Sequence, residues 1–206
     1  MAAASTAPLV ANHHGHHPGF SGISGLVAGL TMLVGRAEVG RLAAGLTAVT
    51  DQDRVVDVGC GPGAAAREAA RRGAQVTGVD PASVMLDLAR RFTHGVRISW
   101  QEGAAEALPL GDGSATVLWS IATVHHWRDL DAGLAEARRV LAPGGRLLAI
   151  ERRTRAGARG LASHGWTDEQ AALFAGACRA AGFSDPRVTI DRRGRRTMLV
   201  VQAIRT

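Results

Sequence analysis

A glycine-rich turn between an apolar run and a helical pattern is the stretch of this sequence that most clearly predicts chemistry. Residues 55–63 read Val-Val-Asp-Val-Gly-Cys-Gly-Pro-Gly, and a second acid, Asp80, closes the next apolar run. Glycines permit positive φ and let the backbone approach a ligand closely. Asp57, two positions before the turn, suits a ligand with a positive amine and repels a pyrophosphate. The turn therefore predicts a site for a small charged cofactor.

The turn by itself does not decide which cofactor is bound. Gly59, Gly61 and Ala64 also satisfy the dinucleotide fingerprint, and Asp80 lies about where a ribose-binding acid belongs. Two later segments help to distinguish between the possible cofactors. They are residues 108–114 (Leu-Pro-Leu-Gly-Asp-Gly-Ser) and residues 139–148 (Arg-Val-Leu-Ala-Pro-Gly-Gly-Arg-Leu-Leu).

The pattern around these segments predicts an α/β fold with a doubly wound sheet. Strands are expected at 54–58, 75–80, 97–102, 116–120 and 146–150. Helices are expected at 64–72, from Pro81 at its first turn, from Asp129 as its cap, and at 167–181. Such alternation indicates a parallel sheet. Two last strands, 187–190 and 197–203, have so short a connection that they must be antiparallel, which makes seven strands in all.

The beginning of the chain predicts a separate behaviour. Residues 1–20 are interpreted as a flexible tail containing histidines, either solvated or lying as a flap over the active site. Its histidines lack carboxylate and cysteine partners, so no metal site is expected there. Residues 21–206 are interpreted as a single domain that begins with a helical segment, 21–50.

Composition limits the class of protein. At 206 residues, 46% hydrophobic and 20% charged, the chain fits one folded domain rather than a disordered one. Its two cysteines suit a reducing compartment, and no apolar run reaches the ~18 residues of a membrane span. We therefore expect a cytoplasmic protein without membrane contact. All 24 basic residues are arginine, which is typical of a GC-rich coding bias and would indicate nucleic-acid binding only if they cluster.

In this order, the motifs resemble the class I S-adenosylmethionine-dependent methyltransferases, particularly the small-molecule branch of the ubiquinone and menaquinone pathways. The resemblance covers about residues 50–151 and implies the Rossmann-like fold of that family. It implies that the glycines meet the methionine part of the cofactor, Asp57 its amine and Asp80 both ribose hydroxyls. The cofactor-binding residues implied are Asp57, Gly59, Cys60, Gly61, Gly63, Asp80, Pro81, Ala104, Ala105 and Ser120.

Two positions depart from the family pattern. Ala104 stands where the family usually has an aspartate that contacts the adenine amino group, so that hydrogen bond is missing or Glu102 or another group supplies it. One such bond is worth about 0.5–1.5 kcal/mol, so binding is weakened rather than abolished. Thr116 replaces the aspartate that usually opens the fourth strand, a position with a more structural role.

The acceptor side of the site is expected after the fourth strand. Residues 120–127 read Ser-Ile-Ala-Thr-Val-His-His-Trp, and the family often carries a histidine pair there. His125 and His126 are the candidate catalytic residues, because histidine titrates near neutrality and can deprotonate a hydroxyl. The alternative is that both pack the loop. Trp127 is expected to pack, and Cys60 is given no nucleophilic role.

The sequence thus predicts methyl transfer from S-adenosylmethionine to a small-molecule acceptor at O, N or C. Three alternatives stay open: a nucleic-acid methyltransferase using the arginines near 152–159 and 192–196, a non-catalytic cofactor-binding protein, and, least favoured, a NAD-dependent dehydrogenase. The acceptor and the oligomeric state are not encoded in these motifs.

Overall fold

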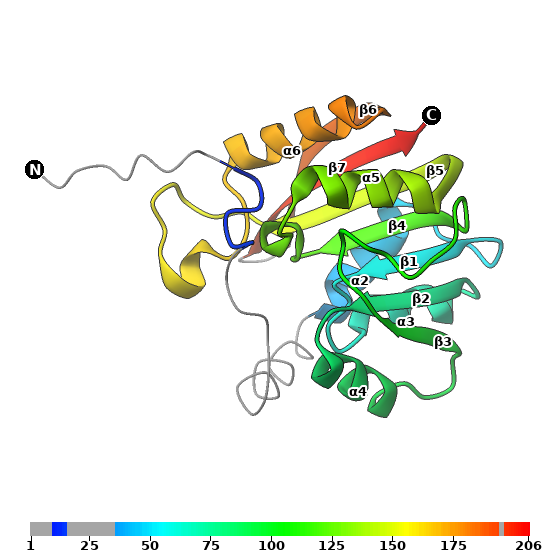
Figure 1. The fold of residues 1–206 in the computed structure, drawn as a ribbon. Helices are drawn as coiled ribbons and strands as arrows, with labels where there is room; N and C mark the ends of the chain where they lie inside the picture. Colours follow the sequence, from blue (N-terminus) through cyan, green and yellow to red (C-terminus); the bar gives the residue numbers. More distant parts are fainter. Residues whose placement is uncertain (1–9, 16–35, 194–195) are drawn as a thin grey trace, which may run out of the picture.

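A seven-stranded mixed sheet forms the centre of the computed structural model, which describes residues 10–15, 36–193 and 196–206. The strands lie in the order β3-β2-β1-β4-β5-β7-β6, with β1 to β5 parallel and the β6–β7 hairpin antiparallel (Figure 1). This confirms the predicted doubly wound fold. The strands are β1 (Arg54–Val58), β2 (Gln75–Asp80), β3 (Ile98–Glu102), β4 (Ala115–Ile121), β5 (Leu141–Arg152), β6 (Phe183–Arg193) and β7 (Arg196–Arg205).

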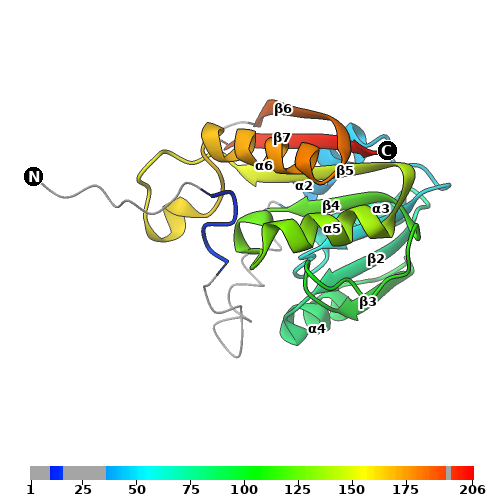
Figure 2. The same ribbon diagram turned by 45° about the horizontal axis from the view of Figure 1, so that its top comes forward.

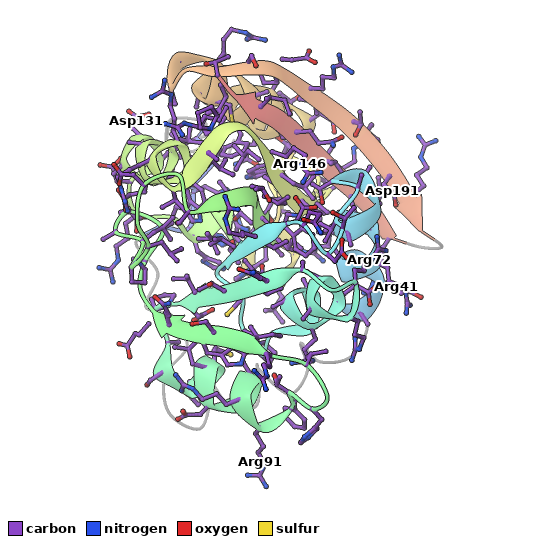
Figure 3. The ribbon with its side chains drawn as sticks, turned by 90° about the vertical axis from the view of Figure 1, so that its right-hand side faces the viewer. Arg41, Arg72, Arg91, Asp131, Arg146 and Asp191 are labelled. Carbon is purple, nitrogen blue, oxygen red and sulfur yellow. The ribbon has the colours of Figure 1, made fainter. Side chains whose placement is uncertain are left out.

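Helices cover both faces of this sheet (Figure 2). They are α2 (Arg36–Leu46), α3 (Ala64–Arg71), α4 (Ser83–Arg91), α5 (Leu130–Val140) and α6 (Asp168–Ala180), with short 3₁₀ turns η1 (Val124–His126) and η2 (Gly160–Ser163). Figure 3 shows Asp131 of α5 and Arg41 of α2 on opposite sides of the sheet. The described residues therefore form three layers.

Alternate residues of the central strands supply two hydrophobic cores. Val56, Leu118 and Leu147 pack with α5 and α6, whereas their neighbours Val55 and Leu148 pack with α2 and α3. Successive side chains of a strand point to opposite faces, so runs that are apolar throughout are what a doubly covered sheet needs.

Two strands begin earlier than expected, because residues that resemble turns in the sequence belong to the strands. β5 begins at Leu141 rather than Arg146, because Leu141 already pairs with Ala115 before an irregularity in the register. β6 begins at Phe183 and passes through a bulge between Ser184 and Arg187. A bulge accommodates the Asp-Pro pair that would otherwise read as a turn.

One helix start was predicted wrongly. α4 begins at Ser83, and Pro81 precedes it rather than opening its first turn. The carboxylate of Asp80 accepts the Ala82 N–H at 2.9 Å, and Ala82 stays extended, with φ −100° and ψ 108°. The Asp129 cap is confirmed, since its side chain accepts the Ala132 N–H at 3.0 Å.

The N-terminal expectations lie only partly within the described residues. α2 falls inside the expected helical segment, whereas residues 1–9 and 16–35 lie outside the description. Residues 10–15 pack against the domain: Ala11 is buried, and the His14 N–H donates to the His125 carbonyl at 2.8 Å. This short segment therefore lies over the end of β4.

Candidate cofactor-binding and active site

The glycine loop after β1 is closed by hydrogen bonds to β2. The N–H groups of Gly59 and Cys60 both donate to the Val79 carbonyl, at 2.8 and 3.0 Å. The Gly61 N–H donates to Asp80 Oδ2 at 2.8 Å. These three amides are used within the protein rather than turned toward a phosphate. These three amides are therefore not available to a phosphate.

Two loop positions require glycine. Gly59 has φ +70°, and a Cβ there would lie 2.5 Å from Thr123 Cγ2. Gly63 has φ +77°, and its Cβ would lie 2.2 Å from Trp100 Cη2. Positive φ is costly for residues with a side chain, and these distances are below any normal contact. The loop is consequently packed between β3 and the turn that follows β4.

Two carboxylates flank this loop. Asp57 is 1% exposed and Asp80 is 7% exposed. Burial raises the pKa of the Cys60 thiol well above its ordinary value, and the charges of Asp57 and Asp80 raise it further. The thiol stays protonated at neutral pH, consistent with the absence of a nucleophilic role. A narrow cavity beside the loop is lined by Asp57, Gly59, Cys60, Ala64, Ala65 and Ile121.

Asp80 is oriented toward the loop by its own hydrogen bonds. Oδ2 accepts the Gly61 N–H, and Oδ1 accepts the Ala82 N–H. An ionised carboxylate has about four lone-pair positions and can accept more than two hydrogen bonds. Asp80 is thus fixed at the mouth of the loop, and Pro81 lies exposed just beyond it.

The segment after β3 is anchored beside Asp80. The Gly103 N–H donates to the Asp80 carbonyl at 3.3 Å, and Ala104 forms an isolated bridge with Ala107. Ala105 is 8% exposed. Glu102 pairs with Asp80 across the sheet, but its side chain is exposed. Ala104 and Ala105 therefore lie at the same sheet edge as the carboxylate.

Arg139 explains why the segments 108–114 and 139–148 occur together. Its guanidinium donates to the carbonyls of Leu108 and Leu110 and to the carboxylates of Glu136 and Asp112. Hydrogen bonds from a charged donor are among the stronger ones in proteins. Arg139 thereby fixes the loop that carries Ala104 and Ala105 to α5.

The end of β4 is tied to the end of β1. Ser120 is fully buried, and its hydroxyl lies 2.6 Å from that of Thr123, which donates to the Val58 carbonyl at 3.0 Å. Between them, Ala122 has φ +56°. This left-handed residue turns the chain so that η1 follows directly after the strand.

η1 carries His125 and His126. The Nδ1 of His125 lies 2.9 Å from Oε2 of Glu151, a fully buried residue near the end of β5. Because an ionised carboxylate only accepts, Nδ1 carries the hydrogen, and Nε2 of the neutral ring holds the lone pair. Burial lowers the pKa of His126 to about 3, with His125, His164 and His14 adding to the effect. His126 is therefore neutral at neutral pH.

The stretch of sequence that carries this site is similar to known proteins. Residues 56–149 match the family model of the methyltransferase domain. This stretch of the chain is similar to a methyltransferase domain. The matched residues include the glycine loop, Asp80, the Ala104–Ala105 pair and both histidines of η1.

Two curated relatives of this stretch are named as methyltransferases of quinones. Demethylmenaquinone methyltransferase of Tropheryma whipplei is 38% identical over 112 residues, which are 54% of this chain and 46% of that protein. Ubiquinone/menaquinone biosynthesis C-methyltransferase of Rubrivivax gelatinosus is 37% identical over 97 residues, 47% of this chain and 38% of that protein. The matches thus span less than half the length of these relatives.

Solved structures share the fold of most of this chain. A SAM-dependent methyltransferase from Aquifex aeolicus superposes with a TM-score of 0.73 at 17% identity, covering 88% of this chain and 98% of that one. Identity this low supports the fold alone. In the described residues, no helix combines the length and apolar character that crossing a bilayer requires.

Several residues around the candidate site were not identified from the sequence. Thr123 and Trp100 define the glycine loop, Glu151 orients His125, and buried Arg67 donates to the Pro62 carbonyl at 2.6 Å. A charged residue at the end of the apolar run 147–150 was the available signal for Glu151. The others meet the loop only through strand order, which local spacing does not contain.

The arginines at the end of β5 make contacts within the protein. Arg152 donates to the carbonyls of Leu161, Ala162 and His164, and Arg153 pairs with Asp168. Trp127 packs edge-on against Phe174, as expected for a core residue. In the second arginine group, Arg195 lies outside the described residues.

Proposed function

We propose that the chain is an S-adenosylmethionine-dependent methyltransferase acting on a small molecule, at O, N or C. One observation carries the proposal. Two buried carboxylates, Asp57 and Asp80, flank a glycine loop whose amides are already used inside the protein. Negative charge beside the loop suits a cofactor with an ammonium group, a sulfonium and ribose hydroxyls, and disfavours a pyrophosphate.

Each part of this cofactor has proposed contacts among the described residues. Gly59, Gly61 and Gly63 would lie against its methionine part, Asp57 would meet the amine and Asp80 the ribose hydroxyls. The proposed adenine contacts come from the backbone of Ala105 and from Ala104, with Cys60, Pro81 and Ser120 completing the set. When bound, the cofactor supplies an electrophilic methyl group on sulfur.

The chain's own contribution is alignment. Well-oriented reactants reach effective molarities of ~10⁵–10⁸ M, so holding the acceptor in line provides much of the catalytic effect. We propose His125 and His126 as the catalytic residues, because both follow the buried end of β4. In this role the pair of His125 with Glu151 directs the lone pair of Nε2 away from β5.

Two observations support a small molecule as the methyl acceptor. Both relatives are named for methylation in quinone biosynthesis, which supports a small organic acceptor. Arg152 and Arg153 hold the connection between β5 and α6, so they argue against an RNA-binding surface at this edge. The two cysteines, buried and unpaired, support a cytoplasmic location.

A labelled-methyl assay tests the proposal. Purified protein is incubated with S-adenosylmethionine labelled in its methyl group and a panel of phenols, hydroquinones, carboxylic acids, amines and bulk RNA. We expect label in at least one small-molecule pool and none in RNA. Transfer to RNA alone, or cofactor binding without transfer to any acceptor on a broad panel, would contradict the proposal.

A further inference from the structure

Four histidines from three distant parts of the chain meet at the end of β4. His14 belongs to the segment 10–15, His125 and His126 to η1, and His164 directly follows η2. The six distances between their ring centroids range from 4.1 to 5.7 Å. Figures 1 and 2 both show residues 10–15, in dark blue, beside the yellow connection between β5 and α6.

The rings are oriented by neighbours outside the group. Glu151 accepts the hydrogen of His125 Nδ1, and His125 Nε2 is buried without a hydrogen-bond partner among the described residues. The Ser163 hydroxyl lies 3.2 Å from Nε2 of His14. A carboxylate behind a histidine is the usual outer support of a metal ligand, since it fixes the ring and its tautomer.

The donor atoms are spaced for one ion. One nitrogen from each ring lies within 4.8 Å of the other three. Zinc–nitrogen bonds of about 2.0–2.1 Å place tetrahedral ligands roughly 3.3 Å apart, so a small inward movement of the rings completes the site. A neighbouring histidine, His13, does not take part, because Gln170 and the Ser163 carbonyl engage its two ring nitrogens.

We propose that His14, His125, His126 and His164 bind a divalent transition-metal ion, with Zn²⁺ as the expected ion. Four imidazole nitrogens favour zinc and its neighbours over magnesium or calcium, which prefer oxygen. Four protein ligands close the coordination sphere, as in structural zinc sites. The ion would fasten the segment 10–15 and the β5–α6 connection onto η1.

This inference does not depend on the proposed methyl transfer, although it shares two residues with it. A bound ion uses the lone pairs of His125 and His126, so these rings cannot accept a proton while they hold it. Metal binding is measured by calorimetry and methyl transfer by the labelled-methyl assay, and either can fail without the other.

Calorimetric titration of tag-free, metal-depleted full-length protein with Zn²⁺ tests the site. We expect one equivalent to bind and Mg²⁺ to give no heat. Loss of an outer-shell partner alone weakens metal binding by about 10–100-fold, so His164→Gln and His126→Gln should each weaken it by more than roughly 100-fold. His164 lies in a connection, so His164→Gln remains informative if His126→Gln does not fold.

Variants at histidines outside the proposed site serve as controls. His94→Gln changes an exposed histidine far along the chain, and the double variant His16→Gln/His17→Gln removes the two histidines of the N-terminal tract that follow Gly15. Both should bind Zn²⁺ like the wild type. The proposal is overturned if the wild type does not bind, or if His164→Gln binds normally while the tract variant loses binding.

Hydrogen exchange tests the fastening role. The His14 N–H donates to the His125 carbonyl, so Zn²⁺ should slow amide exchange in residues 10–15 of the wild type and leave it unchanged in His164→Gln. Zinc binding with no change in exchange would show that the ion does not fasten this segment.

Discussion

At the level of single residues, the glycine loop is shaped by side chains that reach it from other strands. Gly59 and Gly63 were predictable from the motif, because a sharp turn beside a ligand calls for glycine. Trp100 and Thr123, which occupy the space a Cβ would need, were not. Their contacts arise from the order of strands in the sheet rather than from distance along the chain.

Gly63→Ala tests this packing. A left-handed conformation costs a residue with a side chain about 1–2 kcal/mol, and overpacking adds about 1–3 kcal/mol. We expect a loss of about 2–5 kcal/mol in the free energy of unfolding, measured by urea denaturation. In a Trp100→Leu background only the conformational part should remain. Equal losses in both backgrounds would show that Trp100 is not the obstacle.

The histidines proposed as catalytic show a different limit of sequence reasoning. The pair after β4 was identified from its position, but neither the buried partner Glu151 nor the approach of His14 and His164 was foreseen. Each partner comes from another segment, and only the folded chain brings them together. The sequence therefore placed the histidine pair after the fourth strand, but it did not indicate what surrounds the pair.

At the level of elements, one polar cluster joins three strands of the sheet. Asp53, just before β1, accepts hydrogen bonds from Thr50 and from Thr116 of β4, and it pairs with Arg146 of β5. Arg146 is labelled in Figure 3. The threonine that departs from the family pattern at position 116 thus has a structural partner, in line with the expectation for that position.

This cluster predicts a pH-dependent stability. Burial alone would raise the pKa of Asp53, but the hydrogen bonds from Thr116 and Thr50 and the charge of Arg146 lower it below its ordinary 3.8. A lowered pKa in the folded state stabilises the fold above pH ~3.9, and this contribution is lost as the pH falls through the folded-state pKa. Asp53→Asn should therefore cost about 1.5–3 kcal/mol at pH 7 and much less near pH 3.

Urea denaturation at both pH values measures this difference, with the exposed neighbour Asp51→Asn as the control. The control should change stability little at either pH. An Asp53→Asn penalty that stays the same at pH 3 and pH 7 would contradict an ionised Asp53 in this cluster.

Element boundaries were predictable where apolar runs end at glycine and less so where polar side chains intervene. β1 and β2 begin and end at the expected residues. The starts of β5, β6 and α4 moved, because register irregularities and the side chain of Asp80 override local turn signals.

At the level of the whole molecule, the sheet order gathers the site at one edge. The ends of β1, β2 and β4 bring the glycine loop, Asp80 and Ser120 together, as expected for the crevice of an open α/β sheet. Alternating strands and helices made this topology predictable. The packing of residues 10–15 over the end of β4 was not, since no local pattern indicates where such a segment lies.

The central claim is that this edge holds S-adenosylmethionine, and calorimetric titration of the wild-type protein tests it most directly. Asp80→Asn should weaken binding at least about tenfold, or about 1.4 kcal/mol, because it removes the charge between loop and ribose. Asp87→Asn, an exposed acid on α4, serves as the matched control and should bind like the wild type. Folded wild-type protein that binds neither S-adenosylmethionine nor S-adenosylhomocysteine, or an Asp80→Asn variant that binds as tightly as wild type, would contradict the account.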